Sequence, residues 1–66
     1  MSDVESLKAE IKKLSAKAIQ AKMDLHDLAE DLPVNWEKIP EVAQRAHDAF
    51  ALLESKRATL TQLAEA

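Results

Sequence analysis

The sequence predicts an all-α fold in which two helices form an antiparallel hairpin, and two such hairpins dimerise into a four-helix bundle. Three observations predict it. Glycine and cysteine are absent, and alanine, leucine, lysine and glutamate, which favour helices, dominate the composition. Apolar residues recur every seven positions through the first half of the chain. Two prolines, Pro33 and Pro40, flank a single break near the middle.

The first helix is expected over about residues 3–31. Ser2, followed three residues later by Glu5, has the spacing of a capping box at a helix N-terminus. Both seam positions of a heptad then stay apolar, which predicts left-handed, coiled-coil-like packing. Two adjacent alanine layers in this seam leave room for a close helix or for a bulky residue such as Phe50. One seam position holds Val4, Ile11, Ala18, Leu25 and Leu32, and the other holds Leu7, Leu14, Ala21 and Leu28.

An elbow is expected over residues 32–39 and a second helix over about residues 40–64. Pro33 disfavours helical backbone at the residue before it, and Asn35 is a candidate side-chain cap for a single turn. Pro40 suits the first position of the second helix. The second seam is less regular than the first, because a lysine interrupts it. It comprises Val42, Ala46, Ala49, Leu53, Leu60 and Leu63, with Phe50 beside it and Lys56 as the interruption.

A single domain spanning residues 1–66 is too short to bury a large core by itself. Because cysteine is absent, neither a disulfide nor a thiolate metal site can add stability. A homodimer is therefore expected to supply the missing core. The predicted hairpin and dimer core comprises Val4, Leu7, Ile11, Leu14, Ala18, Ala21, Leu25, Leu28, Ala46, Phe50, Leu53 and Leu60.

Several classes of protein are excluded by composition. The apolar runs are only a few residues long, so no membrane span is predicted, and no signal peptide is visible. We therefore expect a cytoplasmic protein. Neither catalysis nor a bound cofactor is expected, because tyrosine, cysteine and glycine-rich loops are missing and the serines have no evident histidine–acid constellation.

Charge is unevenly distributed around a net value of −3. Residues 23–37 carry five carboxylates and neither lysine nor arginine. Most of these carboxylates lie near the C-terminal end of the first helix, where negative charge opposes the helix dipole. Both a solvated helix face and a docking surface for a partner protein fit this pattern. The candidate partner-binding residues are Asp24, His26, Asp27, Glu30, Asp31 and Trp36.

Two apolar features of the sequence have alternative interpretations. The only tryptophan, Trp36, lies in the elbow. We expect it to cap the open end of the bundle core, because a short loop needs an apolar plug to fix its path. The alternative is an anchor for a partner protein. Ile19 and Met23 lie off the seam, where they either widen the core face or form a small exposed patch.

His26 and Glu30 lie one helical turn apart and form a possible weak site for nickel, zinc or iron. Asp27 adjoins them but is expected to point elsewhere. The alternative is a solvated surface histidine, which is also the expectation for His47. Four lysines of the first helix could follow a phosphate backbone, but no aromatic side chain lies among them, so nucleic-acid binding is not expected. These lysines are Lys8, Lys12, Lys13 and Lys17.

Two blocks, KMDLHDLAEDLP at residues 22–33 and NWEKIPEVA at residues 35–43, resemble small Rop-like proteins encoded in nitrogen-fixation gene clusters. The resemblance covers nearly the whole chain. It implies a hairpin that dimerises into a four-helix bundle and a role around nitrogenase. Our first hypothesis is a non-catalytic protein that binds a nitrogenase component or a cofactor-maturation factor. A metal carrier and an RNA-binding regulator are the alternatives, although a shared fold does not transfer RNA binding.

Overall fold

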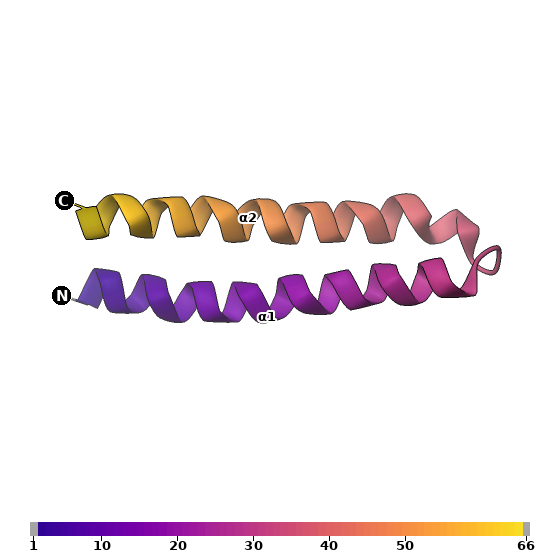
Figure 1. The fold of residues 1–66 in the computed structure, drawn as a ribbon, viewed down its shortest axis with the longest axis horizontal. Helices are drawn as coiled ribbons and strands as arrows, with labels where there is room; N and C mark the ends of the chain where they lie inside the picture. The colour runs from indigo at the N-terminus through magenta and orange to yellow at the C-terminus, as the bar shows by residue number, and fades with distance from the viewer. Residues whose placement is uncertain (1, 66) are drawn as a thin grey trace.

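The computed structural model describes residues 2–65 and the side chains of residues 4–64. It consists of helix α1 (Ser2–Asp31), a short 3-10 turn η1 (Trp36–Lys38) and helix α2 (Ile39–Glu65). The helices run side by side in opposite directions (Figure 1), and the rod measures 49 × 14 × 13 Å. The predicted all-α hairpin is confirmed. The side chain of Ser2, on which the predicted capping box depends, lies outside the described residues.

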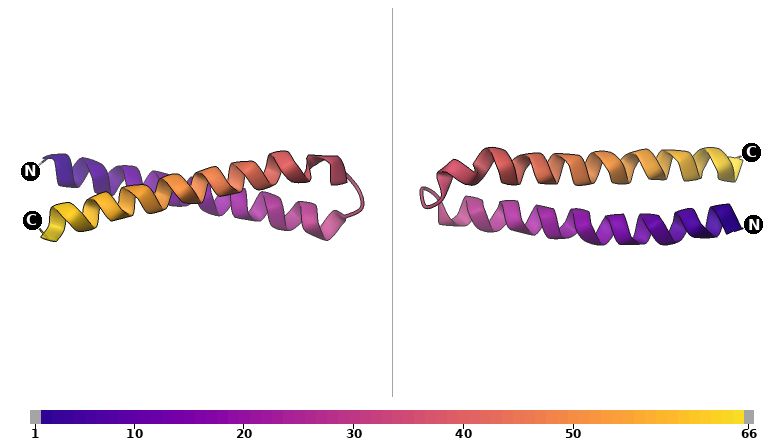
Figure 2. Two further views of the ribbon diagram at one scale, coloured as in Figure 1. Left: turned by 90° about the horizontal axis from the view of Figure 1, so that it is seen from above. Right: turned by 180° about the vertical axis from the view of Figure 1, so that it is seen from behind.

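The core of the hairpin lies where the heptad seam of α1 faces α2. Seen from above, the two helices cross near their middles (Figure 2). Ala18 is fully buried in the middle of α1, and its small side chain lets the helix axes approach closely. The other buried apolar residues are Leu28, Val42, Ala46 and Leu53. The remaining seam residues are only half-buried: Val4, Leu7, Ile11, Leu14, Ala21, Leu25, Ala49 and Leu60.

Three apolar residues that were placed on or beside the predicted seams are exposed in the hairpin. Leu32 follows the last residue of α1, so it leaves the helical register. Phe50 is 38% exposed. Leu53 faces α1, and Phe50, three residues earlier in α2, points roughly 60° away from that direction around the helix. Phe50 therefore lies at the edge of the hairpin core rather than inside it, and Leu63 near the end of α2 is exposed too.

The elbow is held by backbone hydrogen bonds. The amides of Val34, Trp36 and Lys38 donate to the carbonyls of Asp31, Pro33 and Asn35, at 3.0, 3.3 and 2.9 Å respectively. Asn35 adopts the left-handed conformation, with φ 61°, which asparagine tolerates better than most residues.

The prediction that the Asn35 side chain caps the following turn is wrong, because it makes no capping hydrogen bond and only its carbonyl closes η1. The Leu32–Pro33 peptide bond is cis. Pro40 is the second residue of α2 rather than the first. Its missing amide costs little there, because the first amides of a helix have no intrahelical acceptor.

The charge on the second seam is paired across the hairpin. Lys56 is half-buried, and its Nζ lies 3.4 Å from Oε1 of Glu10 on α1. This ion pair partly compensates for a lysine at an otherwise apolar position and joins the two helices at one register. Both side chains keep contact with solvent, so the pair contributes at most about 1 kcal/mol. Neither helix, over the residues described, has an apolar stretch long enough to cross a membrane.

Candidate protein-binding surface at the closed end of the hairpin

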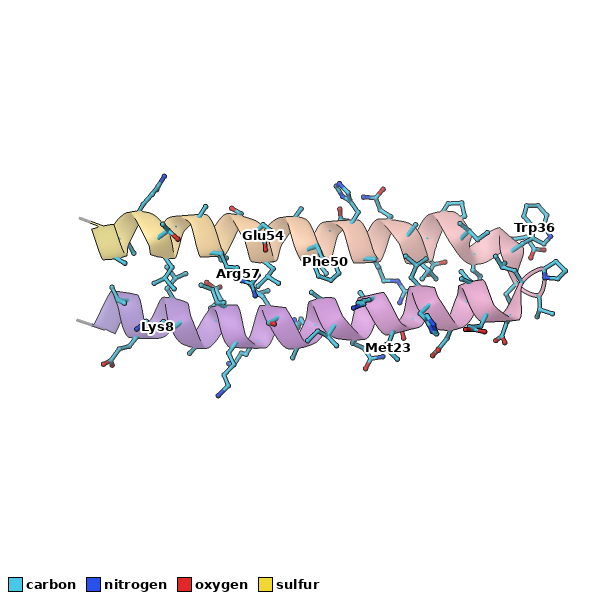
Figure 3. All side chains as sticks on the ribbon, in the orientation of Figure 1. Lys8, Met23, Trp36, Phe50, Glu54 and Arg57 are labelled. Atoms are coloured by element: carbon cyan, nitrogen blue, oxygen red, sulfur yellow. The ribbon has the colours of Figure 1, made fainter. Side chains whose placement is uncertain are left out.

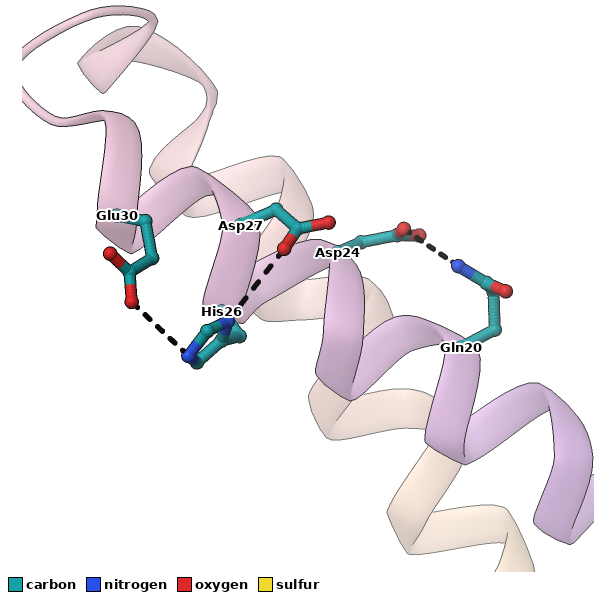
Figure 4. Close-up of polar contacts among 5 residues, drawn as sticks. All are labelled: Gln20, Asp24, His26, Asp27 and Glu30. Atoms are coloured by element: carbon teal, nitrogen blue, oxygen red, sulfur yellow. Dashed lines mark hydrogen bonds and ion pairs between the residues drawn. The ribbon is translucent and has the colours of Figure 1, made fainter.

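The acidic surface consists of Asp24, Asp27, Glu30 and Asp31 on the last two turns of α1. Asp24 is half-buried and accepts a hydrogen bond from Nε2 of Gln20 at 3.0 Å (Figure 4). Asp27, Glu30 and Asp31 are exposed. The last turn of α1 contains no basic residue, so these carboxylates lie at the negative end of the helix dipole without compensation on their own helix.

His26 lies between two of these carboxylates (Figure 4). Its Nε2 is 3.4 Å from Oε1 of Glu30, and its Nδ1 is 3.6 Å from Oδ1 of Asp27. The expectation that Asp27 points elsewhere is therefore wrong. Adjacent helical residues differ by roughly 100° in direction, and the rotamers of both side chains close this gap.

This arrangement limits what the histidine can bind. The two ring nitrogens face different carboxylates, so an ion on Nε2 would have only His26 and Glu30 as protein ligands. Among the described residues, no three histidine or acidic side chains converge in a way that could hold a metal. Structural metal sites usually have about four ligands, so the His26–Glu30 pair can provide only a weak site.

The lysine and arginine ion pairs of the described side chains lie elsewhere on the molecule. Arg57 pairs with Glu54 at 3.0 Å, Arg45 with Glu41 at 3.3 Å, and Lys56 with Glu10. None of these pairs reaches the acidic surface. Its negative potential is thus free to attract and orient a cationic surface on another molecule.

Trp36 lies beyond the end of the helices and points away from them (Figure 3), with 61% of the residue exposed. The prediction that it caps the core is therefore wrong for the hairpin. The reason is local, because the turn at Asn35 makes Trp36 the first residue of η1, and no residue of η1 is buried.

Sequence reasoning also missed that the apolar residues around Trp36 share its exposure. Leu32, Val34 and Ile39 are all exposed. The available signal was that Val34 and Ile39 lie beyond the last heptad position, and that Leu32, which holds this position, directly precedes Pro33, where helical backbone is disfavoured.

A shallow apolar groove runs along one side of the hairpin, between α1 and α2. It is lined by Lys22 and Leu25 of α1 and by Ala43, Ala46, His47, Phe50, Ala51 and Glu54 of α2. Phe50 lies between the two ribbons in Figure 3, whereas Met23 points away from α2.

The remaining predicted surface residues are exposed. His47 lies outside the core, with its Nδ1 3.4 Å from Oδ1 of Asp48. Ile19 and Met23 are exposed, which favours the small apolar patch over a wider core. The lysines of the possible phosphate track, Lys8, Lys12, Lys13 and Lys17, are exposed as well.

Comparison with known proteins identifies relatives over nearly the whole chain. A UPF0437 protein of Azorhizobium caulinodans is 62% identical over 63 residues, covering 96% of this chain and 91% of that protein. A Frankia alni protein, described as a UPF0437 protein in the nifX–nifW intergenic region, is 49% identical over 49 residues. That alignment covers 74% of this chain and 60% of the Frankia protein.

An NMR structure from the Northeast Structural Genomics Consortium has the same architecture. It aligns with a TM-score of 0.85 and 49% sequence identity, covering 92% of this chain and 86% of that one. The Rop-like family model matches residues 2–65. The confirmed helical hairpin and this match agree with the resemblance found in the central sequence blocks, and the chain belongs to the Rop-like family.

Proposed function

We propose that this protein is a non-catalytic interaction protein of nitrogen fixation, which forms a homodimeric four-helix bundle in the cytoplasm. Through the acidic surface it binds a nitrogenase component or a cofactor-maturation factor. The observation that carries the proposal is the set of four carboxylates at the C-terminal end of α1, three of them exposed, with no lysine or arginine paired to them among the described side chains. The position of the Frankia alni relative between nifX and nifW supports the setting.

The incompletely covered seam supports the homodimer. Seam residues such as Leu7, Ile11 and Leu14 are only half-buried against α2. Phe50 and Ala51 leave further apolar surface in the groove between α1 and α2. A second hairpin packed against such surfaces would supply the core that a chain of this size lacks by itself.

The acidic surface supports a protein partner because folding does not account for it. Lysines at Asp24 and Asp27 would suit the helix dipole better than carboxylates do. Native structures break such local rules mainly where function requires it. The charge selects a cationic partner surface and would speed its association.

The test compares the wild type with the double variant Asp24→Lys/Asp27→Lys. Each is immobilised and titrated with purified nitrogenase components and cofactor-maturation proteins at low salt. We expect the double variant to bind roughly tenfold more weakly, from two charge contacts worth up to about 1 kcal/mol each. The difference should shrink as salt is raised, because screening weakens both contacts. The melting temperature should stay the same or rise.

A matched control makes the same change of net charge elsewhere. The variant Glu5→Lys/Asp48→Lys reverses two exposed carboxylates outside the acidic surface. It should bind like the wild type. If the Asp24→Lys/Asp27→Lys variant binds every tested protein as tightly as the control does, the acidic surface is only a solvated helix face and the proposal is wrong.

A further inference from the structure

The closed end of the hairpin presents a cluster of large apolar side chains that we call the apolar tip. It consists of Leu32, Val34, Trp36 and Ile39, all within the eight residues that lead from α1 into α2. Val34 and Trp36 are 60% and 61% exposed. Single apolar residues on a surface need no explanation, but four exposed ones within eight consecutive residues at the closed end mark a candidate interaction site.

Folding of the hairpin does not require these side chains. No residue of η1 is buried, and the elbow is held by three hydrogen bonds between backbone atoms. Polar residues at Val34 and Trp36 would leave these bonds intact and remove the apolar surface. The exposed tip is thus an extra feature of the sequence rather than a consequence of closing the hairpin.

The apolar tip is also held in a fixed shape. The amides of Val34 and Trp36 are both bonded within the turn, and η1 continues directly into α2. A patch on such a closed turn loses little conformational entropy when it binds, which favours affinity. Tryptophan at its outer end is the residue type most often found as a binding hot spot.

Charges around the tip define what it fits. Asp31 ends α1, Glu37 lies inside η1, and Glu41 lies in the first turn of α2. Glu41 is paired with Arg45 at 3.3 Å, which leaves Asp31 and Glu37 against Lys38, the one lysine in this stretch. Carboxylates therefore outnumber lysines around the apolar tip. A complementary site is an apolar pocket with lysines or arginines on its rim.

We infer that the apolar tip inserts into an apolar pocket of the partner protein, and that the rim of this pocket is basic. The inference rests on the proposed function and specifies the chemistry of its partner. Two alternatives fit less well. An anionic membrane surface would repel the carboxylates around the tip, and so would the identical tip of a second copy.

The experiment uses Trp36 as a reporter, because it is the only tryptophan in the chain. The full-length chain is prepared with 5-fluorotryptophan, which gives one fluorine NMR signal, and is titrated with the same purified nitrogenase components and cofactor-maturation proteins. We expect the signal to shift with one of these proteins and to become protected from a soluble paramagnetic quencher. The affinity of Trp36→Ala for that protein should be roughly 30-fold weaker, as for a hot-spot residue.

Leu52→Ala is the matched control, because Leu52 is an exposed leucine on α2 away from the tip. Its affinity should equal that of the wild type. The basic rim of the pocket is tested by Glu37→Lys, which should weaken binding at low salt. This loss of affinity should shrink as salt is raised.

Three results would overturn the inference. If a partner binds and the Asp24→Lys/Asp27→Lys variant loses affinity while the Trp36 signal does not move, the tip is not in the interface, although the proposed function survives. If the signal moves on dilution of the chain alone, a second copy covers the tip. If none of the proteins binds, the proposed function and the inference fail together.

Discussion

Truncation of Leu53 tests the orientation of α2 in the hairpin. Leu53 is 3% exposed, the most buried leucine of the chain, whereas its neighbour Leu52 is 47% exposed. Replacing a buried leucine by alanine costs about 2–5 kcal/mol, through lost burial and the cavity left behind. A chain of this length has a total stability of roughly 3–10 kcal/mol. Leu53→Ala thus removes a large share of it.

The assay is thermal unfolding followed by circular dichroism at equal protein concentrations. In a domain of this size, about 1 kcal/mol corresponds to a shift of roughly 4–8 °C in Tm. Leu53→Ala should therefore lower Tm by roughly 10–30 °C. Leu52→Ala has about half as much burial to lose and should lower Tm by about 5 °C or less. Leu53→Met, which nearly conserves volume, should retain most of the stability.

Equal losses for Leu52→Ala and Leu53→Ala, or a larger loss for Leu52→Ala, would refute this orientation of α2. The comparison is repeated at a tenfold higher protein concentration, because association raises the apparent stability of an oligomer. A loss for Leu52→Ala that varies with concentration would place Leu52 in the contact between hairpins.

Two further predictions concern the metal alternative and the seam. Calorimetric titration with nickel or zinc should show only weak binding, which His26→Ala abolishes without changing the fold. A tight stoichiometric site, or unfolding on chelation, would favour the metal-carrier hypothesis. Lys56→Leu should raise Tm, because an apolar side chain on the seam gains more from burial than the half-exposed pair with Glu10 contributes. A fall in Tm would show that this ion pair determines the register of the helices.

The heptad of α1 carried most of the information about the fold. Strict apolar spacing from Val4 to Leu28 specifies a long helix with one apolar stripe, and Pro33 specifies where that stripe stops. A helical hairpin follows from these two features. Burial within the hairpin could not be read in the same way. Periodicity gives the direction in which a residue points but not how far the opposite helix covers it, as Phe50 shows.

The closed end was harder to predict because its conformation depends on a few backbone torsions. The left-handed Asn35 starts η1, and this turn decides that Trp36 points outward rather than over the core. No periodic pattern encodes such a turn. The contact between His26 and Asp27 was missed for a similar reason, since it depends on side-chain rotamers that spacing along a helix does not fix. The acidic surface itself could be located from the sequence, because it needs only the charges and the helix end.

The central claim is that this chain works by contacting other proteins, the first of which is a second copy of itself. Sedimentation equilibrium tests this claim most directly. The experiment measures the mass of the wild-type chain in solution at micromolar concentration. The seam left half-covered by one hairpin predicts a folded species of twice the 7.3 kDa chain mass. A well-folded species that stays at the mass of one chain at these concentrations would contradict the account.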